Sequence, residues 1–266
     1  MLKKLKILLD NEIDPAYAKR AEFIFQTVER EKPKRILDVG CGRGFYVNAL
    51  SLYDFPKEII GLDINKEYLE EARRYASDMR AKFIRKSVYS INYTNNYFDL
   101  VICSELLEHL SYDKKALSEI FRVLKKGGTL IVTVPSEDFP LFWDPVNWVL
   151  MRFFNTHINK DVWFLAGIWA GHERLYNMKN LSRIIEEAGF SILEMSGVIS
   201  FSWPFSHFLL YGLGKNIVER LNVKSLNRFE LKKNNIKIFL AKLFSYPTKL
   251  SIGDSSVDII VLAKKN

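Results

Sequence analysis

The segment Asp38-Val39-Gly40-Cys41-Gly42-Arg43-Gly44 places three glycines between a short apolar run and the start of a helical pattern. Glycines at the end of a strand let the backbone approach a ligand, and the following helix supplies unpaired N–H groups. A dinucleotide fingerprint needs a third glycine where Phe45 stands, and no Gly-Lys-Ser/Thr follows as in a P-loop. Asp38, just before the glycines, instead suits a ligand that carries an ammonium group.

Apolar runs and helical patterns alternate along the first half of the chain. We predict strands at about 36–39, 58–63, 82–85, 98–103 and 129–134, and helices at about 15–31, 45–52, 66–78 and 112–124. A helix at about 178–188 and strands at about 190–195 and 257–263 follow. Ser111 is the expected N-cap of the helix at 112–124, and Gly127-Gly128 its expected end. The alternation predicts an α/β fold, with a doubly wound, mostly parallel seven-stranded sheet and helices on both faces.

The chain is predicted to form one domain over residues 1–266. Its parts are a helical lead (1–32), a core (33–135), an aromatic-rich insertion (136–176) and a C-terminal part (177–266). Four of the five tryptophans lie in the insertion, at Trp143, Trp148, Trp163 and Trp169. These rings either pack as core or line an apolar acceptor pocket as a lid, and we favour the pocket.

The net charge of +8 is concentrated near the C-terminus. Residues 213–250 hold nine basic and two acidic residues, which leaves only +1 for residues 1–212. A basic helical segment is predicted at about 205–245, after an uncharged stretch at 195–214. That stretch is too rich in serine and glycine to span a membrane. Together with the basic segment that follows it, however, it suits the surface of an anionic bilayer. Nucleic acid binding is less expected, and solvated helix faces are the remaining alternative.

Two cysteines cannot form a disulfide scaffold, and the first ten residues contain only three consecutive apolar side chains. This run is too short for the core of a signal peptide. We therefore expect a cytoplasmic protein, whose only membrane association would be peripheral.

Five short motifs occur in order within residues 33–135. They are Ile36-Leu37-Asp38-Val39-Gly40-Cys41-Gly42-Arg43-Gly44, Gly61-Leu62-Asp63-Ile64, Phe98-Asp99-Leu100-Val101-Ile102, Leu107-Glu108-His109-Leu110 and Arg122-Val123-Leu124-Lys125-Lys126-Gly127-Gly128. Their order and spacing resemble the motifs of class I S-adenosylmethionine-dependent methyltransferases, with a weaker echo at Gly171-His172-Glu173-Arg174. The resemblance implies a Rossmann-like fold, S-adenosyl-L-methionine as cofactor and S-adenosyl-L-homocysteine as product.

The resemblance also implies which residues hold the cofactor. Asp38, Gly40, Cys41, Gly42 and Gly44 would hold the methionine portion, Asp63 and Ile64 the ribose, and Ser87 and Val88 the adenine, while Cys103, Ser104 and Glu105 would lie where the methionine carboxylate meets the acceptor. Ser87 stands where the family usually has an acidic residue. Its hydroxyl or a backbone carbonyl would then contact the adenine amino group.

Two histidines are the candidate catalytic residues. His172 follows Gly171 at the edge of the insertion and is the better acceptor-side candidate, although it could equally be a loop histidine bonded to backbone. His109, beside Glu108, could act as a general base, but we favour a structural role in holding its loop. No spacing of histidine, cysteine and carboxylate residues indicates a metal site, and Cys41 and Cys103 are interpreted as small strand-end residues.

Methyl transfer from a sulfonium is an in-line displacement, so the enzyme mainly aligns the acceptor atom and excludes water. The aromatic-rich insertion favours an apolar acceptor. We predict transfer to an O, N or C atom of a small, apolar or lipid-linked acceptor. An RNA or protein methyltransferase that uses residues 213–250 is the first alternative. A cofactor-binding regulator without turnover is the second.

Overall fold

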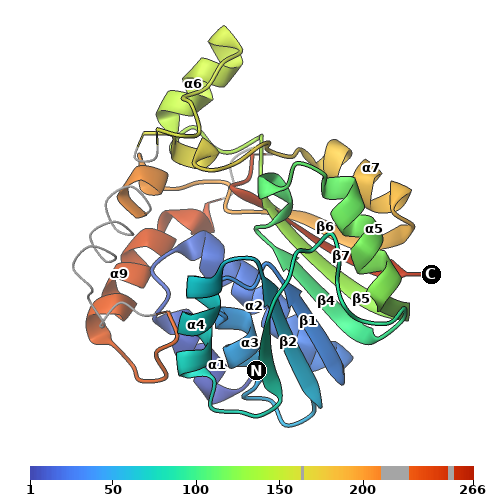
Figure 1. Ribbon diagram of the computed structural model, residues 1–266. Helices are drawn as coiled ribbons and strands as arrows, with labels where there is room; N and C mark the ends of the chain where they lie inside the picture. The colour runs from blue at the N-terminus through green and yellow to red at the C-terminus, as the bar shows by residue number, and fades with distance from the viewer. Residues whose placement is uncertain (163–164, 211–227, 251–254) are drawn as a thin grey trace.

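The computed structural model describes residues 1–162, 165–210, 228–250 and 255–266, and its centre is a seven-stranded sheet (Figure 1). The strands are β1 (Arg35–Val39), β2 (Glu58–Asp63), β3 (Ala81–Arg85), β4 (Phe98–Ser104), β5 (Leu124–Pro135), β6 (Phe190–Val198) and β7 (Asp258–Lys265). Their order is β3-β2-β1-β4-β5-β7-β6. Strands β1 to β6 share one direction, and β7 runs opposite to them between β5 and β6. The predicted doubly wound, Rossmann-like sheet is confirmed.

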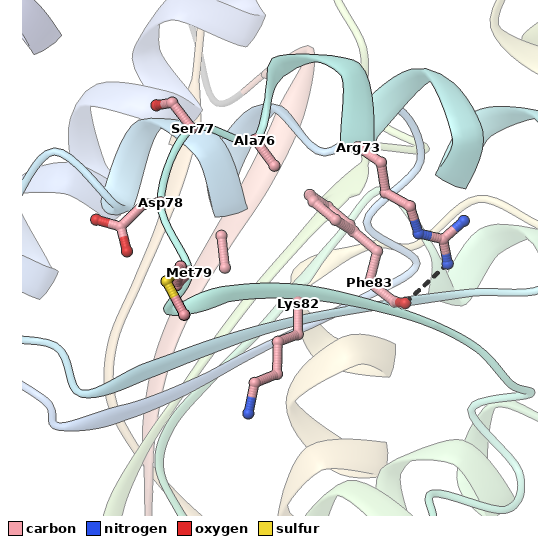
Figure 2. A pocket seen from close by; sticks show the side chains of 8 residues that line it. Arg73, Ala76, Ser77, Asp78, Met79, Lys82 and Phe83 are labelled. Carbon is pink, nitrogen blue, oxygen red and sulfur yellow. Dashed lines mark hydrogen bonds between the residues drawn. The ribbon is translucent and has the colours of Figure 1, made fainter.

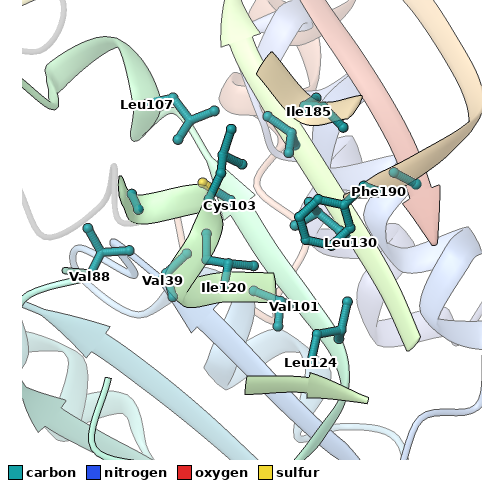
Figure 3. Packing of buried hydrophobic residues seen from close by; sticks show 14 of the residues in the cluster. Val39, Val88, Val101, Cys103, Leu107, Ile120, Leu124, Leu130, Ile185 and Phe190 are labelled. Carbon is teal, nitrogen blue, oxygen red and sulfur yellow. The ribbon is translucent and has the colours of Figure 1, made fainter. Parts of the chain in front are cut away.

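Alternate residues along each strand pack against helices on opposite faces of the sheet. The helices are α1 (Lys3–Asp10), α2 (Pro15–Glu31), α3 (Phe45–Leu50), α4 (Lys66–Tyr75), α5 (Asp113–Val123), α6 (Pro145–Phe154), α7 (Met178–Glu187) and α9 (Asn235–Ser245). On β1, Ile36 joins the core formed with α1–α4, whereas Leu37 and Val39 join the core formed with α5 and α7. Figure 3 shows this second core, in which Ile120 and Ile185 meet the strands. The two-residue period of a strand explains the two cores.

Two helix starts near the site follow directly from their capping residues. The Asp14 side chain accepts hydrogen bonds from the N–H groups of Ala16 and Tyr17, and Pro15 occupies the first turn of α2. The Asn65 side chain accepts from the N–H of Tyr68 at the start of α4. Both residues satisfy N–H groups that a helix leaves unpaired.

The predicted helix at 112–124 ends earlier than the glycines indicate. Helix α5 ends at Val123, and β5 begins at Leu124, which is fully buried and pairs with Phe98. Gly127 and Gly128 therefore lie inside the strand, where the register with β4 shifts, rather than at a helix C-cap. The prediction of Ser111 as N-cap is also wrong, because Tyr112 occupies that position and makes no side-chain capping bond.

The aromatic insertion is anchored by a buried carboxylate. Asp144 caps α6, accepting from the N–H of Asn147, and also accepts from the N–H of Ile168 across the insertion. Phe139 and Trp143 are buried in a third core, so these two rings do not line an open pocket. Trp148 and Trp169 are partly buried there, and Trp163 lies outside the described residues. Helix α6 projects from the molecule at the top of the view (Figure 1).

The predicted basic helix at 205–245 is confirmed only in part. Helix α9 spans Asn235–Ser245, whereas residues 228–234 are not helical and residues 211–227 lie outside the described chain. Two helices were predicted too long, since α3 ends at Leu50 and α4 at Tyr75. None of the described helices has the length and apolar character needed to cross a membrane.

Candidate active site

The glycine loop follows β1 at the carboxyl edge of the sheet. Gly40 and Gly44 have φ angles of +70° and +75°, which side chains rarely adopt. A Cβ on Gly40 would lie 2.8 Å from the Leu106 side chain, and one on Gly44 would lie 2.7 Å from Phe83. The N–H groups of Gly40 and Cys41 both donate to the Leu62 carbonyl oxygen. The loop is therefore closely packed at Gly40 and Gly44, where both the φ angle and the space favour glycine.

Asp38 lies beneath this loop with 2% of its surface exposed. Its Oδ2 has no hydrogen-bond partner among the described residues. Burial and, secondarily, the nearby Asp63 carboxylate raise the pKa of Asp38 well above its usual value. A nearby cation would stabilise the ionised form of such a buried, unpartnered carboxylate. The ammonium group of a bound amino acid moiety meets that requirement, so the site fits the methionine end of S-adenosylmethionine.

Asp63, at the end of β2, is held by two backbone N–H groups. Its Oδ2 accepts from Gly42 and its Oδ1 from Asn65, each at 2.8 Å. These bonds fix the carboxylate while leaving lone pairs for further donors, as the contact predicted with ribose hydroxyls requires. Ile64, the next residue, is 68% exposed and offers an apolar face beside it.

The two residues predicted to face the adenine differ in their surroundings. The Ser87 hydroxyl accepts from the Tyr89 N–H at 3.2 Å, so its own hydrogen remains able to donate. The Val88 side chain is instead buried in the core with α5 and α7. Ser87 can therefore contact a ligand through its hydroxyl, whereas Val88 mainly supports the loop.

The end of β4 joins a polar network that includes residues the sequence analysis missed. Ser104 and Thr133 share a hydrogen bond of 2.8 Å, and Thr133 donates to Glu105 at 3.0 Å. The other Glu105 oxygen lies 3.4 Å from Arg20 of α2, which also pairs with Asp258 of β7. Arg20 occupies the apolar stripe of its helix, between Ala16 and Ile24, and that position was the signal available in the sequence. Cys103 is fully buried, and burial raises the pKa of its thiol well above the usual range.

The two candidate histidines lie together with Glu108. The His109 and His172 rings are 4.7 Å apart between centroids, and Glu108 Oε1 lies 3.7 Å from His109 Nε2. One ligand-type atom from each of the three side chains lies within 4.8 Å of the others, a spacing that could hold a metal ion. The Glu173 N–H donates to the Glu108 carbonyl oxygen at 2.8 Å, so the insertion is tied to the β4 loop here.

The surroundings of the two histidines do not support the ranking of His172 above His109 as the catalytic candidate. Burial, with the nearby His109 as a smaller cause, lowers the pKa of His172 to about 3. The His172 ring is thus neutral near pH 7 and a weak base, better suited to accept a hydrogen bond or bind a cation. His109 is exposed, and its Nδ1 lies 2.8 Å from the Gly171 carbonyl oxygen, which supports the predicted role in holding the loop.

Two hollows lie on the surface outside the predicted site residues. The larger, with a volume of about 460 Å³, lies between α4 and β3 and is lined by side chains that include Arg73, Met79 and Phe83 (Figure 2). The other is lined by Glu31, Asp99 and Lys125 among others. Neither contains a predicted site residue.

Comparison with known proteins identifies the family. A family model described as a methyltransferase domain matches residues 37–132. An uncharacterized protein of Methanocaldococcus jannaschii is 34% identical over 211 residues, covering 71% of this chain and 89% of that protein. A ubiquinone biosynthesis O-methyltransferase of Aeromonas salmonicida is 26% identical, covering 69% of this chain and 72% of the relative. The chain belongs to the class I S-adenosylmethionine-dependent methyltransferases.

A third relative is similar to this chain over only part of its length. A small RNA 2'-O-methyltransferase of Mus musculus is 30% identical over 142 residues, which cover 48% of this chain. The chain spans only 36% of the length of that relative. The similarity therefore covers less than half of either protein.

Proposed function

We propose that this methyltransferase transfers the methyl group to an oxygen atom of a small, apolar or lipid-linked acceptor. The observation that carries the proposal is the cluster of Glu108, His109 and His172 at the carboxyl end of β4. A hydroxyl acceptor must lose a proton, and His109 Nε2, the ring nitrogen that is not bonded to Gly171, offers a lone pair for it beside the glycine loop. Leu106, which contacts Gly40, and Glu108 belong to the same short loop.

Each part of the site would then have a defined task. Asp38 binds the ammonium group of the methionine portion. Asp63 accepts hydrogen bonds from the ribose, and the Ser87 hydroxyl contacts the adenine. S-adenosylmethionine supplies an activated methyl group, so the chain mainly has to align the acceptor oxygen and exclude water.

An apolar surface beside the insertion supports a lipid-linked acceptor and association with a membrane surface. Trp203, Phe205 and Leu209 are exposed, and the Trp203 ring N–H donates to the Leu243 carbonyl oxygen of α9. The exposed face of α9 carries Ile236, Phe239, Leu243 and Tyr246, with Lys232, Lys233 and Lys242 also exposed. Aromatic and apolar side chains next to lysines suit an anionic bilayer.

An RNA 2'-hydroxyl is the second candidate acceptor, because one relative is a small RNA 2'-O-methyltransferase. It would use the same cluster and the basic residues 213–250 to hold the phosphate backbone. The described part of that segment presents an apolar face together with its lysines, which favours the lipid surface.

Calorimetric titration with S-adenosylmethionine tests the cofactor site. Wild type and Asp54→Ala, a control with an exposed carboxylate, should bind, whereas Asp63→Ala should bind at least tenfold more weakly. Transfer of labelled methyl groups to a lipid extract and to small RNA then tests the acceptor. Labelling of RNA alone would contradict the lipid-linked acceptor. Unchanged S-adenosylmethionine binding in Asp63→Ala would contradict the proposed cofactor site. Co-sedimentation with anionic but not neutral vesicles tests the membrane surface.

A further inference from the structure

We propose that Glu108, His109 and His172 bind a divalent transition-metal ion. The site itself stands on the geometry and chemistry of these three side chains. Only its consequence for the acceptor rests on the proposed function.

The three ligand groups come from two separate parts of the chain that backbone contacts hold together. Glu108 and His109 lie in the short 3-10 helix Leu107–His109 after β4, and His172 lies in the insertion. Their ligand atoms are within 4.8 Å of one another. Hydrogen bonds from Glu173 N–H to the Glu108 carbonyl oxygen and from His109 Nδ1 to the Gly171 carbonyl oxygen clamp the two segments. The spacing of the ligands is therefore set by the fold rather than by flexible surface side chains.

The His109 ring is arranged as metal-ligating histidines usually are. A carbonyl oxygen can only accept, so the contact with Gly171 requires the hydrogen to be on Nδ1. In the neutral ring, Nε2 then carries the free lone pair, and it is Nε2 that faces Glu108 Oε1 at 3.7 Å. A backbone carbonyl that fixes the tautomer in this way orients the ring and increases its basicity as a ligand.

Glu108 and His172 both lack the partners that buried polar groups normally have. Glu108 is fully buried, and neither of its carboxylate oxygens has a hydrogen-bond partner among the described residues. The Nδ1 atom of His172 is also buried and unpartnered there. A bound cation would satisfy both groups at once.

The type of ligands indicates the type of metal. Two imidazole nitrogens and one carboxylate suit Zn²⁺, Mn²⁺, Fe²⁺ or Co²⁺, whereas Mg²⁺ and Ca²⁺ prefer oxygen ligands throughout. Three protein ligands leave coordination positions open. An acceptor hydroxyl bound there would lose its proton to water more easily. Its oxygen would form the bond to the methyl carbon, and the carbon–sulfur bond would break with its electron pair remaining on sulfur.

Titration of the metal-free full-length chain with Co²⁺ tests the site, because bound Co²⁺ gives a visible absorption spectrum. Wild type should bind one ion with this spectrum. Glu108→Gln and His172→Ala should each weaken binding about 100-fold or more, beyond the 10–100-fold that loss of an outer partner costs. Glu194→Gln and His157→Ala, which replace exposed residues of the same types, should bind as wild type does. Because Glu108 must lose its proton, Co²⁺ affinity should rise with pH.

Two outcomes would overturn the metal site: no Co²⁺ spectrum in wild type, or an equal spectrum in Glu108→Gln. Glu108→Gln removes a buried acid without changing its size, so its melting temperature without metal should be no lower than that of wild type. S-adenosylmethionine binding is measured on the same samples. If the cofactor binds and Co²⁺ does not, the metal site is wrong and the methyltransferase function stands; the reverse result rejects the function alone.

Discussion

Replacement of Arg20 by methionine tests whether this buried cation stabilises the polar network that it forms with Glu105 and Asp258. Arg20 is 3% exposed and Asp258 is 2% exposed, so water does not reach this pair. The Arg20 guanidinium also lies 3.4 Å from Glu105. Removing the arginine leaves the Asp258 carboxylate buried without its cation, which typically costs about 3–5 kcal/mol.

The loss should be visible in urea unfolding followed by circular dichroism, with the slope of the transition unchanged. A loss of about 3–5 kcal/mol corresponds to a melting temperature lower by about 6–20 °C in a domain of this size. The double variant Arg20→Met/Asp258→Leu removes both charges and should recover most of the loss, because an apolar pair can replace a buried ion pair. Glu22→Met, at a half-exposed position on the same helix, is the control and should change little.

The pH dependence provides a second check on the same reasoning. Burial raises the pKa of Asp258 and Arg20 opposes that rise. Without Arg20 the pKa of Asp258 in the folded state should rise further, so the variant should lose stability as the pH increases through that value. The deficit of Arg20→Met relative to wild type should therefore be smaller at pH 5 than at pH 8. A deficit below about 1 kcal/mol, or a double variant as unstable as the single one, would refute the argument.

Three further predictions concern the cofactor side and the insertion. Gly40→Ala should lower stability by about 1–3 kcal/mol in urea unfolding and abolish S-adenosylmethionine binding in calorimetry, because its Cβ would meet Leu106 and its φ is +70°; unchanged binding would contradict the close packing of the loop. The raised pKa of Asp38 means that wild type without ligand loses stability as the pH rises through that value, so Asp38→Asn should melt higher than wild type at pH 8 while binding the cofactor at least tenfold more weakly. The pKa of His172 is lowered to about 3, so wild type should lose stability as the pH falls below about 6.5, and His172→Gln should lose less between pH 7 and pH 4.5 in thermal melts; equal losses would argue against a buried neutral ring.

The placement of the candidate cofactor half of the site at the carboxyl edge of the sheet was predictable because many of its residues are adjacent in sequence. Asp38 and the glycines of its loop occupy seven consecutive positions, and their spacing already excludes a dinucleotide fingerprint and a P-loop. Alternating strands and helices likewise predict a parallel sheet whose carboxyl edge collects Asp38, Asp63 and Cys103. The errors in this half are local. Gly127 and Gly128 have the composition of a helix end, but burial of Leu124 starts β5 first.

The acceptor half was decided by tertiary structure. His172 is 63 positions beyond His109, and no local spacing predicts that their rings lie 4.7 Å apart. The low pKa of His172 and the unpartnered carboxylate of Glu108 arise from burial by the insertion, which a residue-type pattern does not reveal. Arg20 and Asp258 meet because α2 packs against the strand nearest the C-terminus. Local backbone geometry depends on neighbouring residues and can therefore be predicted from the sequence. Desolvation and long-range charge pairing depend instead on which distant segments pack together.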